Sequence, residues 1–544
     1  MKKTISVLLC ILMFFTFAMP AFAAGSSSYR GPIPTILITG DGDQIVDPDG
    51  NVLYDSTDRW AALKRDDSSD GNSAIAEAAK NIFFPFLLEG VLQDKWDNYY
   101  EAIYQEILDL YEGTILDGNG NPQNGSDISV KHRNENAKAM TENRKDSKNT
   151  YAFNGYHFWY DWRLDPIQIA DELNTYIEGI KETTKHDKVC IVTRCIGSSV
   201  LLAYIAEYGT GSIYGIGMDG SASYGSEFIS GALSGDFTID GDSISRYLAD
   251  ARAYNRLNVD PFVDTTLELL ENSGALDHMT TAARNLLYLK IEKGVISAIA
   301  RATYLTMPCY WALVSADKYE TAKKYVFGEE GDPKRTEYAG LIEKLDHYDV
   351  KVRRRIPELL TSVADAGANV CIIAKYGTQI IPIVKDADWV GDEYASVRSS
   401  SYGATASKLY TTLTDDEIAG VDEKYISPDK QINASTCLFP DSTYFVKGAR
   451  HAEWSLVEND IIMRTIQADH QLTADDMEYT RFVIAYGDTN RWEVMTEDNC
   501  NIENWSSTST VEKPTTKQGR LQLFIVTVIK WAVSLVKKLV DLFS

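Results

Sequence analysis

The stretch that most constrains the fold is 189–208, V-C-I-V-T-R-C-I-G-S-S-V-L-L-A-Y-I-A-E-Y. Residues 189–193 are typical of a short buried strand, and 197–208 has the apolar content of a buried helix. Because so few residues separate the two, the strand must pass into the helix through a sharp turn. Such a turn lifts one side chain above the carboxyl end of a parallel sheet, and here that side chain is Cys195.

Other segments repeat the alternation of strand and helix. Residues 167–183 carry apolar side chains at helical spacing, and 213–218 is another short apolar run. Further strand patterns occur at 34–40, 370–374 and 444–447. Strands that alternate with crossover helices build a parallel sheet. We therefore predict an α/β fold with a mostly parallel sheet flanked by helices.

Composition changes divide the chain into six predicted parts. Residues 228–365 contain several helical patterns and no strand of comparable strength, which predicts a helical cap inserted into the core. The predicted parts are a signal peptide (1–24), the first part of the core (30–227), the cap (228–365), the second part of the core (366–470), a C-terminal extension with a linker (471–515) and an amphipathic helix (519–544).

The N-terminus has the pattern of a secretory signal peptide. Lys2 and Lys3 precede a long apolar run, and Ala-Phe-Ala ends at Ala23 as a small-residue cleavage site. The alternative is an uncleaved anchor helix. We predict a secreted, extracellular protein, with attachment to the cell envelope as a further option.

The C-terminal segment 519–544 is apolar nearly throughout, with a single polar stripe. This pattern predicts an amphipathic helix that lies on a membrane or on a partner helix. A spanning helix is disfavoured because Lys530 would lie in the middle of the bilayer. The alternative is a helix packed back on the domain.

The charge of the chain excludes one class of partner. The formal net charge of -25 repels a phosphate backbone, so we predict no nucleic-acid partner. The acidic turn at 41–49 does not have the spacing of a calcium loop, and the cysteines form no CxxC pattern. We predict no metal, no cofactor and no dense disulfide framework.

Cys195 is the predicted nucleophile. A thiol at a helix N-terminus beside a cation, here Arg194, loses its proton more easily, and a thiolate attacks an ester carbonyl readily. The alternative is an inert cysteine in a site that has lost its activity.

A base and an acid are expected later in the chain, in the order nucleophile, acid, histidine. His451 follows the strand pattern at 444–447 through a short loop, which is where such a histidine belongs. We choose Asp429 as the acid that orients it. The rival carboxylates are Asp441, Asp415, Asp416 and Asp422.

Two backbone N–H groups are needed to stabilise the oxyanion. We predict that Ile196, directly after the nucleophile, supplies one and that Asp41, in the loop after the first strand, supplies the other. The predicted substrate-binding residues are Gly40, Gly42 and Arg194, the glycines because they permit close approach of the backbone.

Five segments, in this order, resemble the lecithin:cholesterol acyltransferase-like lipase family within the α/β-hydrolases. They are P-T-I-L-I-T-G from Pro34, Y-D-W-R-L-D-P from Tyr160, T-R-C-I-G-S from Thr193, S-P-D-K-Q-I-N-A-S from Ser427 and H-A-E-W from His451. The resemblance covers roughly 35–60, 151–225 and 368–455. It implies an α/β-hydrolase fold with a helical cap, and a serine esterase, lipase or acyltransferase acting on lipid esters without a metal.

The sequence departs from that family at the reacting positions. Cys195 stands in place of serine, Arg194 in place of histidine, and Lys430 and Gln431 in place of Gly-Thr in the acid loop. We predict a hydrolase or acyltransferase that acts on ester, lipid-like substrates through a Cys-His-Asp triad. The alternative is a catalytically retired α/β-hydrolase that binds a lipid or an envelope ligand.

Overall fold

A computed structural model describes residues 33–40, 44–54, 95–111, 114–129, 156–238, 303–451, 453–486 and 491–500. Several predicted features lie outside these residues. They are the signal peptide, the middle of the cap, the C-terminal helix predicted at 519–544, and the residues Asp41 and Gly42. Within the described segments, no helix combines the length and the apolar character that crossing a bilayer requires.

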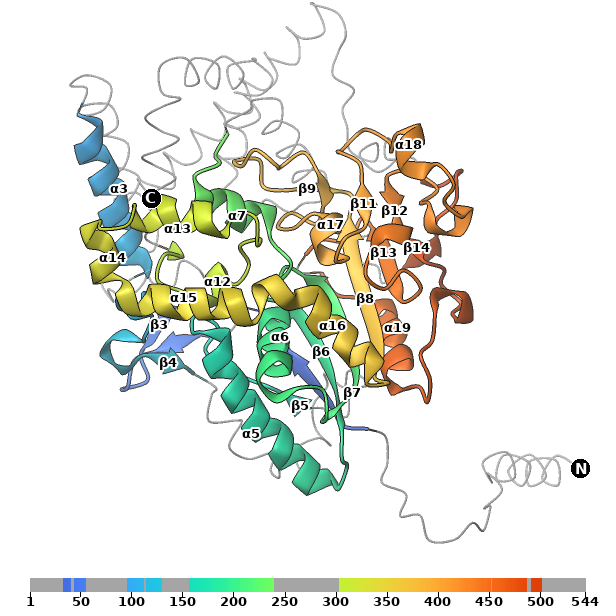
Figure 1. The fold of residues 1–544 in the computed structure, drawn as a ribbon, viewed down its shortest axis with the longest axis horizontal. Coiled ribbons are helices and arrows are strands. Elements are labelled where there is room, and N and C mark those ends of the chain that lie inside the picture. Colours follow the sequence, from blue (N-terminus) through green and yellow to red (C-terminus); the bar gives the residue numbers. More distant parts are fainter. Residues whose placement is uncertain are drawn as a thin grey trace, which may run out of the picture. The chain divides into compact units, whose positions relative to one another are not determined.

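An eight-stranded sheet forms the centre of the described structure (Figure 1). Its order is β15-β14-β13-β8-β7-β6-β1-β5, and every neighbouring pair is parallel except β14 with β15. The strands are β1 (Thr35–Ile38), β5 (Tyr156–His157), β6 (Val189–Cys195), β7 (Ile213–Ser221), β8 (Asn369–Tyr376), β13 (Thr443–Lys447), β14 (Phe482–Ala485) and β15 (Trp492–Val494). The predicted mostly parallel α/β sheet is confirmed.

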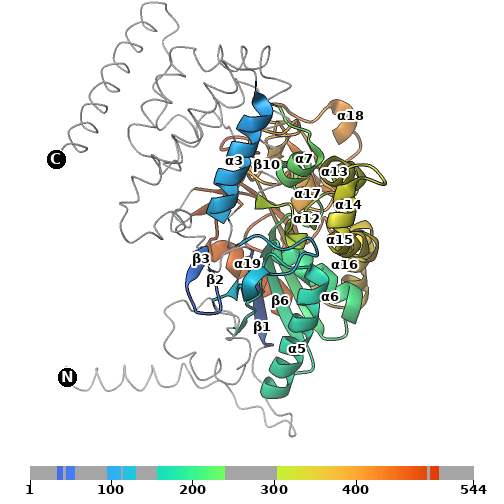
Figure 2. The same cartoon turned by 90° about the vertical axis from the view of Figure 1, so that its left-hand side faces the viewer.

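Helices cover both faces of this sheet (Figures 1 and 2). One face carries α5 (Pro166–Thr184), α6 (Gly197–Tyr208) and α16 (Ile356–Asp365), and the other carries α19 (Leu456–Gln467). Alternate side chains of a strand point to opposite faces, so Ile191 lies in the cluster with α5 and α6 while Val192 lies in the cluster with α19. The near-continuous apolar runs of the sequence follow from this two-sided burial.

Shorter elements lie around the sheet. The β2–β3 turn is closed by the Asp47 carboxylate, which accepts from the backbone N–H groups of Asp49 and Asn51. The remaining elements are β2 (Ile45–Val46), β3 (Val52–Tyr54), α3 (Trp96–Tyr111), β4 (Asp127–Ile128), α7 (Glu227–Ser234), α12 (Pro308–Trp311), α13 (Tyr319–Phe327), α14 (Pro333–Glu337), α15 (Ala339–Lys351), β9 (Thr378–Gln379), β10 (Val390–Gly391), α17 (Val397–Ser400), β11 (Thr405–Ala406), α18 (Asp415–Ile418) and β12 (Ile432–Asn433), with short 3-10 turns at 123–125, 353–355, 423–425, 434–436 and 474–476.

Two predicted domain boundaries are corrected. Helix α16, assigned to the cap at 228–365, packs against α6 and β8 and belongs to the layer that covers the sheet. Strands β14 and β15, assigned to the extension at 471–515, extend the main sheet, so the core continues beyond 470. Helix α16 directly precedes the parallel strand β8, so it is the crossover helix of that strand. Strands as short as β14 and β15 give little periodicity to recognise in the sequence.

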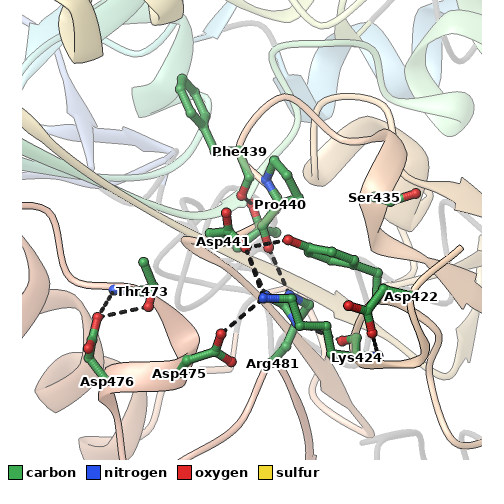
Figure 3. A network of polar contacts seen from close by, with 12 residues as sticks. Asp422, Lys424, Ser435, Phe439, Pro440, Asp441, Thr473, Asp475, Asp476 and Arg481 are labelled. Atoms are coloured by element: carbon green, nitrogen blue, oxygen red, sulfur yellow. Dashed lines mark hydrogen bonds and ion pairs between the residues drawn. The ribbon is translucent and has the colours of Figure 1, made fainter.

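A polar network stabilises the amino ends of β13 and β14 (Figure 3). The guanidinium of Arg481 donates to the backbone oxygens of Pro440 and Lys424 at 2.8 and 2.6 Å, and it approaches Asp441 Oδ1 at 3.3 Å. Lys424 Nζ in turn lies 3.1 Å from Asp475 Oδ2. Arg481 directly precedes β14, so the network lies at the end of the sheet opposite to Cys195.

Candidate active site

The order of the strands along the chain reverses between β1 and β6. The chain goes from β1 outward to the edge strand β5 and then returns to the other side of β1 as β6. Ligands of open α/β sheets bind at the carboxyl ends of the strands at such a reversal. Gly40 and Cys195 meet here: a Cβ placed on Gly40 would lie 3.0 Å from Cys195 Cβ and 3.5 Å from Sγ. The predicted substrate-binding glycine therefore borders the thiol.

Cys195 ends β6 in a conformation that L-residues rarely adopt. Its φ is +49°, in the left-handed region, a strain of about 1–3 kcal/mol that clusters at functional sites. The turn is tight enough that a Cβ on Gly197 would lie 2.4 Å from the backbone oxygen of Ile38. The predicted sharp turn between strand and helix is confirmed, and it requires a glycine at 197.

His451 lies on the loop after β13 and pairs with a buried carboxylate. Its Nδ1 is 2.8 Å from Asp392 Oδ2, and its backbone N–H donates to the backbone oxygen of Asp392 at 3.0 Å. The two side chains are 6% and 0% exposed. Burial opposes the charged imidazolium, but the Asp392 carboxylate and then the Cys195 sulfur outweigh it and raise the pKa of His451 well above its ordinary value.

The other ring nitrogen of His451, Nε2, is buried. It lies within electrostatic reach of the Cys195 thiol, since that sulfur contributes to the raised histidine pKa. Among the described side chains, none makes a hydrogen bond of ordinary geometry to Nε2. Catalytic hydrogen bonds are often long before substrate binds, so this arrangement suits a thiol–imidazole pair.

The structure corrects the choice of acid. Asp429 Oδ2 lies 2.6 Å from Lys447 Nζ and accepts from Tyr376 Oη at 3.0 Å, while Oδ1 accepts from Ser427 Oγ. Its carboxylate therefore serves the buried lysine of β13 and does not orient His451. The rivals are also elsewhere: Asp415 and Asp416 begin the exposed helix α18, and Asp441 and Asp422 lie in the network of Figure 3.

Asp392, which the sequence reasoning missed, occupies the position beside the histidine. It follows β10 in V-G-D-E-Y, 59 positions before His451. Its Oδ1 accepts from the backbone N–H groups of Tyr394 and Ala395 at 3.2 and 3.0 Å, which leaves Oδ2 for the imidazole. The only local signal was a Gly-Asp pair in the loop that follows β8, a pattern shared by many surface turns.

Neighbouring elements hold the Asp392 loop. The Tyr394 ring lies 5.1 Å from the His451 ring, centroid to centroid. Glu227, at the start of α7, accepts from the backbone N–H and the hydroxyl of Ser396 and from the hydroxyl of Ser399. Burial raises the pKa of this carboxyl, although these donors oppose the rise. Helix α7 thus fixes the loop that carries the acid.

Arg194, predicted to bind substrate, packs within the protein. Its guanidinium carbon lies 3.1 Å from the centroid of the Trp454 ring, and its Nε lies 3.5 Å from Asp219 Oδ2. Its side chain is 23% exposed. Since Trp454 follows His451 closely in the chain, this stacking links the strand that carries the thiol to the segment that carries the histidine.

Below this contact is a fully buried charge cluster. Lys375 Nζ lies 2.9 Å from Asp219 Oδ1 and 3.3 Å from Glu458 Oε1, and it donates to the backbone oxygen of Glu453. Burial raises the pKa of Glu458 to about 7, although Lys375 opposes the rise. The cluster connects β7 and β8 to the start of α19, next to the histidine loop.

The remaining cysteines differ from Cys195 in environment. Burial raises the pKa of Cys190 and of Cys371 to about 12, and that of Cys437 to about 11. Burial likewise raises the pKa of Cys309 and Cys500. Among the described residues every cysteine is a free thiol. Cys190 and Cys371 are fully buried within an apolar cluster.

One predicted oxyanion donor is described. Ile196 is the N-cap residue of α6, directly before Gly197, so its N–H has no partner within the helix. The other, Asp41, and the neighbouring Gly42 lie outside the described residues. In the described segments, no group of three or more His, Cys, Asp or Glu side chains has an arrangement that could hold a metal ion.

Comparisons with known proteins add little. No protein-family model matches the chain, and no curated protein matches it. A solved structure, "The crystal structure of Tle4-Tli4 complex", is 11% identical and covers 92% of this chain and 99% of that chain, at a TM-score of 0.26. A likeness at that score carries no argument, and the chain belongs to the α/β class by its own mostly parallel sheet.

Proposed function

We propose that this chain is an α/β-hydrolase-fold hydrolase or acyltransferase in which Cys195 is the nucleophile, His451 the base and Asp392 the acid. The observation that carries the proposal is a buried imidazole that is paired with a carboxylate and whose pKa is raised in part by the sulfur of a strained cysteine at the end of β6. Three side chains from distant parts of the chain gather at the carboxyl ends of the strands. Their order, nucleophile, acid, histidine, is that of α/β-hydrolases.

The first half of the proposed reaction forms a thioester. The Cys195 thiol gives its proton to His451 Nε2, and the thiolate attacks the acyl carbonyl carbon, so that a C–S bond forms and the carbonyl oxygen takes the negative charge. We assign the stabilisation of that oxygen to the N–H of Ile196, because this residue directly follows the nucleophile at the start of α6. The C–O bond to the leaving alcohol then breaks, and His451 returns the proton to the alcohol oxygen.

The second half releases the acyl group. Water, or an alcohol in an acyltransferase, gives a proton to His451 and attacks the thioester carbonyl. The C–S bond breaks, and the proton passes back to the sulfur. Asp392 fixes the ring tautomer through Nδ1 and stabilises the imidazolium.

The substrate class rests on the resemblance of the five segments to lecithin:cholesterol acyltransferase-like lipases. We therefore propose ester substrates of lipid character. Secretion, through 1–24, and contact with a membrane or partner helix, through 519–544, are proposed on their sequence patterns alone.

Iodoacetamide labelling followed by peptide mapping tests this proposal. Cys195 is expected to react far faster at neutral pH than the other cysteines, whose thiols have raised pKa values. His451→Ala should remove this selectivity. His470→Ala is the matched control because that ring, paired with Asp469, is 72% exposed. Equal, slow labelling of all thiols, unaffected by His451→Ala, would instead favour the retired binding protein.

A further inference from the structure

A second ion pair lies directly beside the Asp392–His451 pair. Glu393 follows Asp392 in the chain, and Arg450 precedes His451. Arg450 Nε lies 2.8 Å from Glu393 Oε1, and its second guanidinium nitrogen lies 2.8 Å from Oε2. Two consecutive acidic residues of one loop therefore form ion pairs with two consecutive basic residues of the other loop.

The second pair is built with a geometry that restricts its motion. A bidentate contact between a guanidinium and a carboxylate fixes orientation as well as distance. The Glu393 side chain is 11% exposed and that of Arg450 28%, so solvent screens the pair only in part. The backbone hydrogen bond from His451 N–H to the Asp392 oxygen lies between the two pairs.

Backbone strain at Glu393 also indicates that its side chain has a specific role. Its φ is +92°, a value that glycine adopts freely and that glutamate adopts at a cost. Glycine would be the favoured residue for this turn if only its shape mattered. A glutamate held in this conformation gains the contact with Arg450.

We propose that Glu393 and Arg450 are positioning residues, which hold the Asp392 loop and the His451 loop in register so that Nε2 faces the Cys195 sulfur. This inference rests on the proposed function and names no contact with substrate. The pair acts through Asp392 and His451. Without it, the imidazole should sample orientations that no longer accept the thiol proton, and the thiolate should lose its partner.

The test is the pH at which Cys195 reaches half of its maximal rate of alkylation by iodoacetamide. Among the described residues, the titratable and charged groups around the histidine include Asp392, Cys195, Glu393, Tyr394, Arg450 and Glu453, so the profile is compared between variants at constant ionic strength. Glu393→Gln should move the midpoint upward by about one pH unit, a tenfold loss of thiolate at a given pH. Arg450→Gln should act alike, and the double variant should be no worse than either single variant.

Two further variants separate positioning from folding. Glu393→Gly removes the carboxylate but relieves the strained backbone, so it should raise the midpoint without the loss of thermal stability expected for Glu393→Gln. Arg450→Lys keeps the charge but not the bidentate contact, so it should rescue the profile only in part. Glu358→Gln is the matched control: it breaks a remote, exposed bidentate pair with Arg355 and should leave the midpoint unchanged.

The outcomes distinguish this inference from the proposed function. If wild-type labelling depends on His451 but the Glu393 and Arg450 variants keep the wild-type midpoint, the positioning role is overturned and the proposed function stands. If wild-type labelling of Cys195 does not depend on His451, both fail together. Raised midpoints in Glu393→Gly and Glu393→Gln, with no change in Glu358→Gln, support the inference.

Discussion

Two buried aspartates in the long connection between β8 and β13 each pair with a basic side chain, and the two pairs differ in whether the base can still exchange a proton. Asp429 contacts Lys447, within β13, and Asp392 contacts His451, just past its end. The lysine ammonium is an ion pair inside the domain, with both oxygens of its acid occupied. The imidazole keeps a second nitrogen to which no described side chain makes a hydrogen bond, and the Cys195 sulfur contributes to its raised pKa. A buried acid thus becomes a candidate catalytic group only if its partner can still exchange a proton.

The largest expected effect comes from exchanging each acid for its amide. In Asp392→Asn, turnover of p-nitrophenyl acetate should fall by about a thousandfold, because the amide favours the wrong imidazole tautomer and cannot stabilise the imidazolium. Asp429→Asn should change turnover less than about threefold, because its contacts go to Lys447 and Tyr376. Steady-state rates of refolded, matched preparations measure both, and similar losses in the two variants would break the comparison.

The free energy of unfolding should respond in the opposite order, with a larger loss in Asp429→Asn than in Asp392→Asn. Asp429→Asn leaves the ammonium of Lys447, which is 2% exposed, without its counter-charge, and this should cost about 3 kcal/mol of unfolding free energy. Replacing both partners, Asp429→Leu with Lys447→Met, should cost less than either single change. Urea denaturation of the wild type, Asp429→Asn, the two single variants and the double variant measures these costs; a double variant less stable than both singles would contradict this account of the pair.

The pH dependence of stability tests the histidine side. Because the pKa of His451 is raised in the folded chain, its proton stabilises the fold fully below about pH 6.5, the unfolded value, and this contribution is lost as pH rises through the folded value. The stability advantage of wild type over His451→Gln should therefore shrink between about pH 6 and pH 9. Thermal melts in matched buffers measure it, and an advantage that grows with pH would refute the assigned direction.

The smallest effect is expected from a hydroxyl. Tyr376→Phe removes one donor to Asp429 and should cost about 1 kcal/mol of stability, with no change in the alkylation of Cys195. Urea midpoints and labelling rates of the same preparations give the two readouts. Altered labelling in this variant would connect the Asp429 region to the candidate site after all.

The sequence was most informative where structure is local. The strand, turn and helix at 189–208 could be predicted because their apolar pattern and small residues lie within a few positions of one another. His451 followed from its place just after a strand. The short strands β5, β14 and β15 could not be recognised, because two to four residues show no clear period.

The acid could not be predicted because its position depends on tertiary packing. Asp392 and Asp429 lie in the same long connection, and both sit in turn-like stretches of sequence. What separates them is the path of the chain through β9 and β10, together with the grip of Glu227 on Ser396. Neither leaves a pattern in the sequence around Asp392.

Peptide mapping after brief acid quenching of a p-nitrophenyl acetate reaction tests the central claim most directly. The account predicts an acetyl thioester on Cys195 in the wild type, formed together with a burst of p-nitrophenol, and greatly slowed in His451→Ala. It predicts none on the buried thiols Cys190 and Cys371. No acetyl group on Cys195, with p-nitrophenol released equally fast by Cys195→Ala, would contradict it.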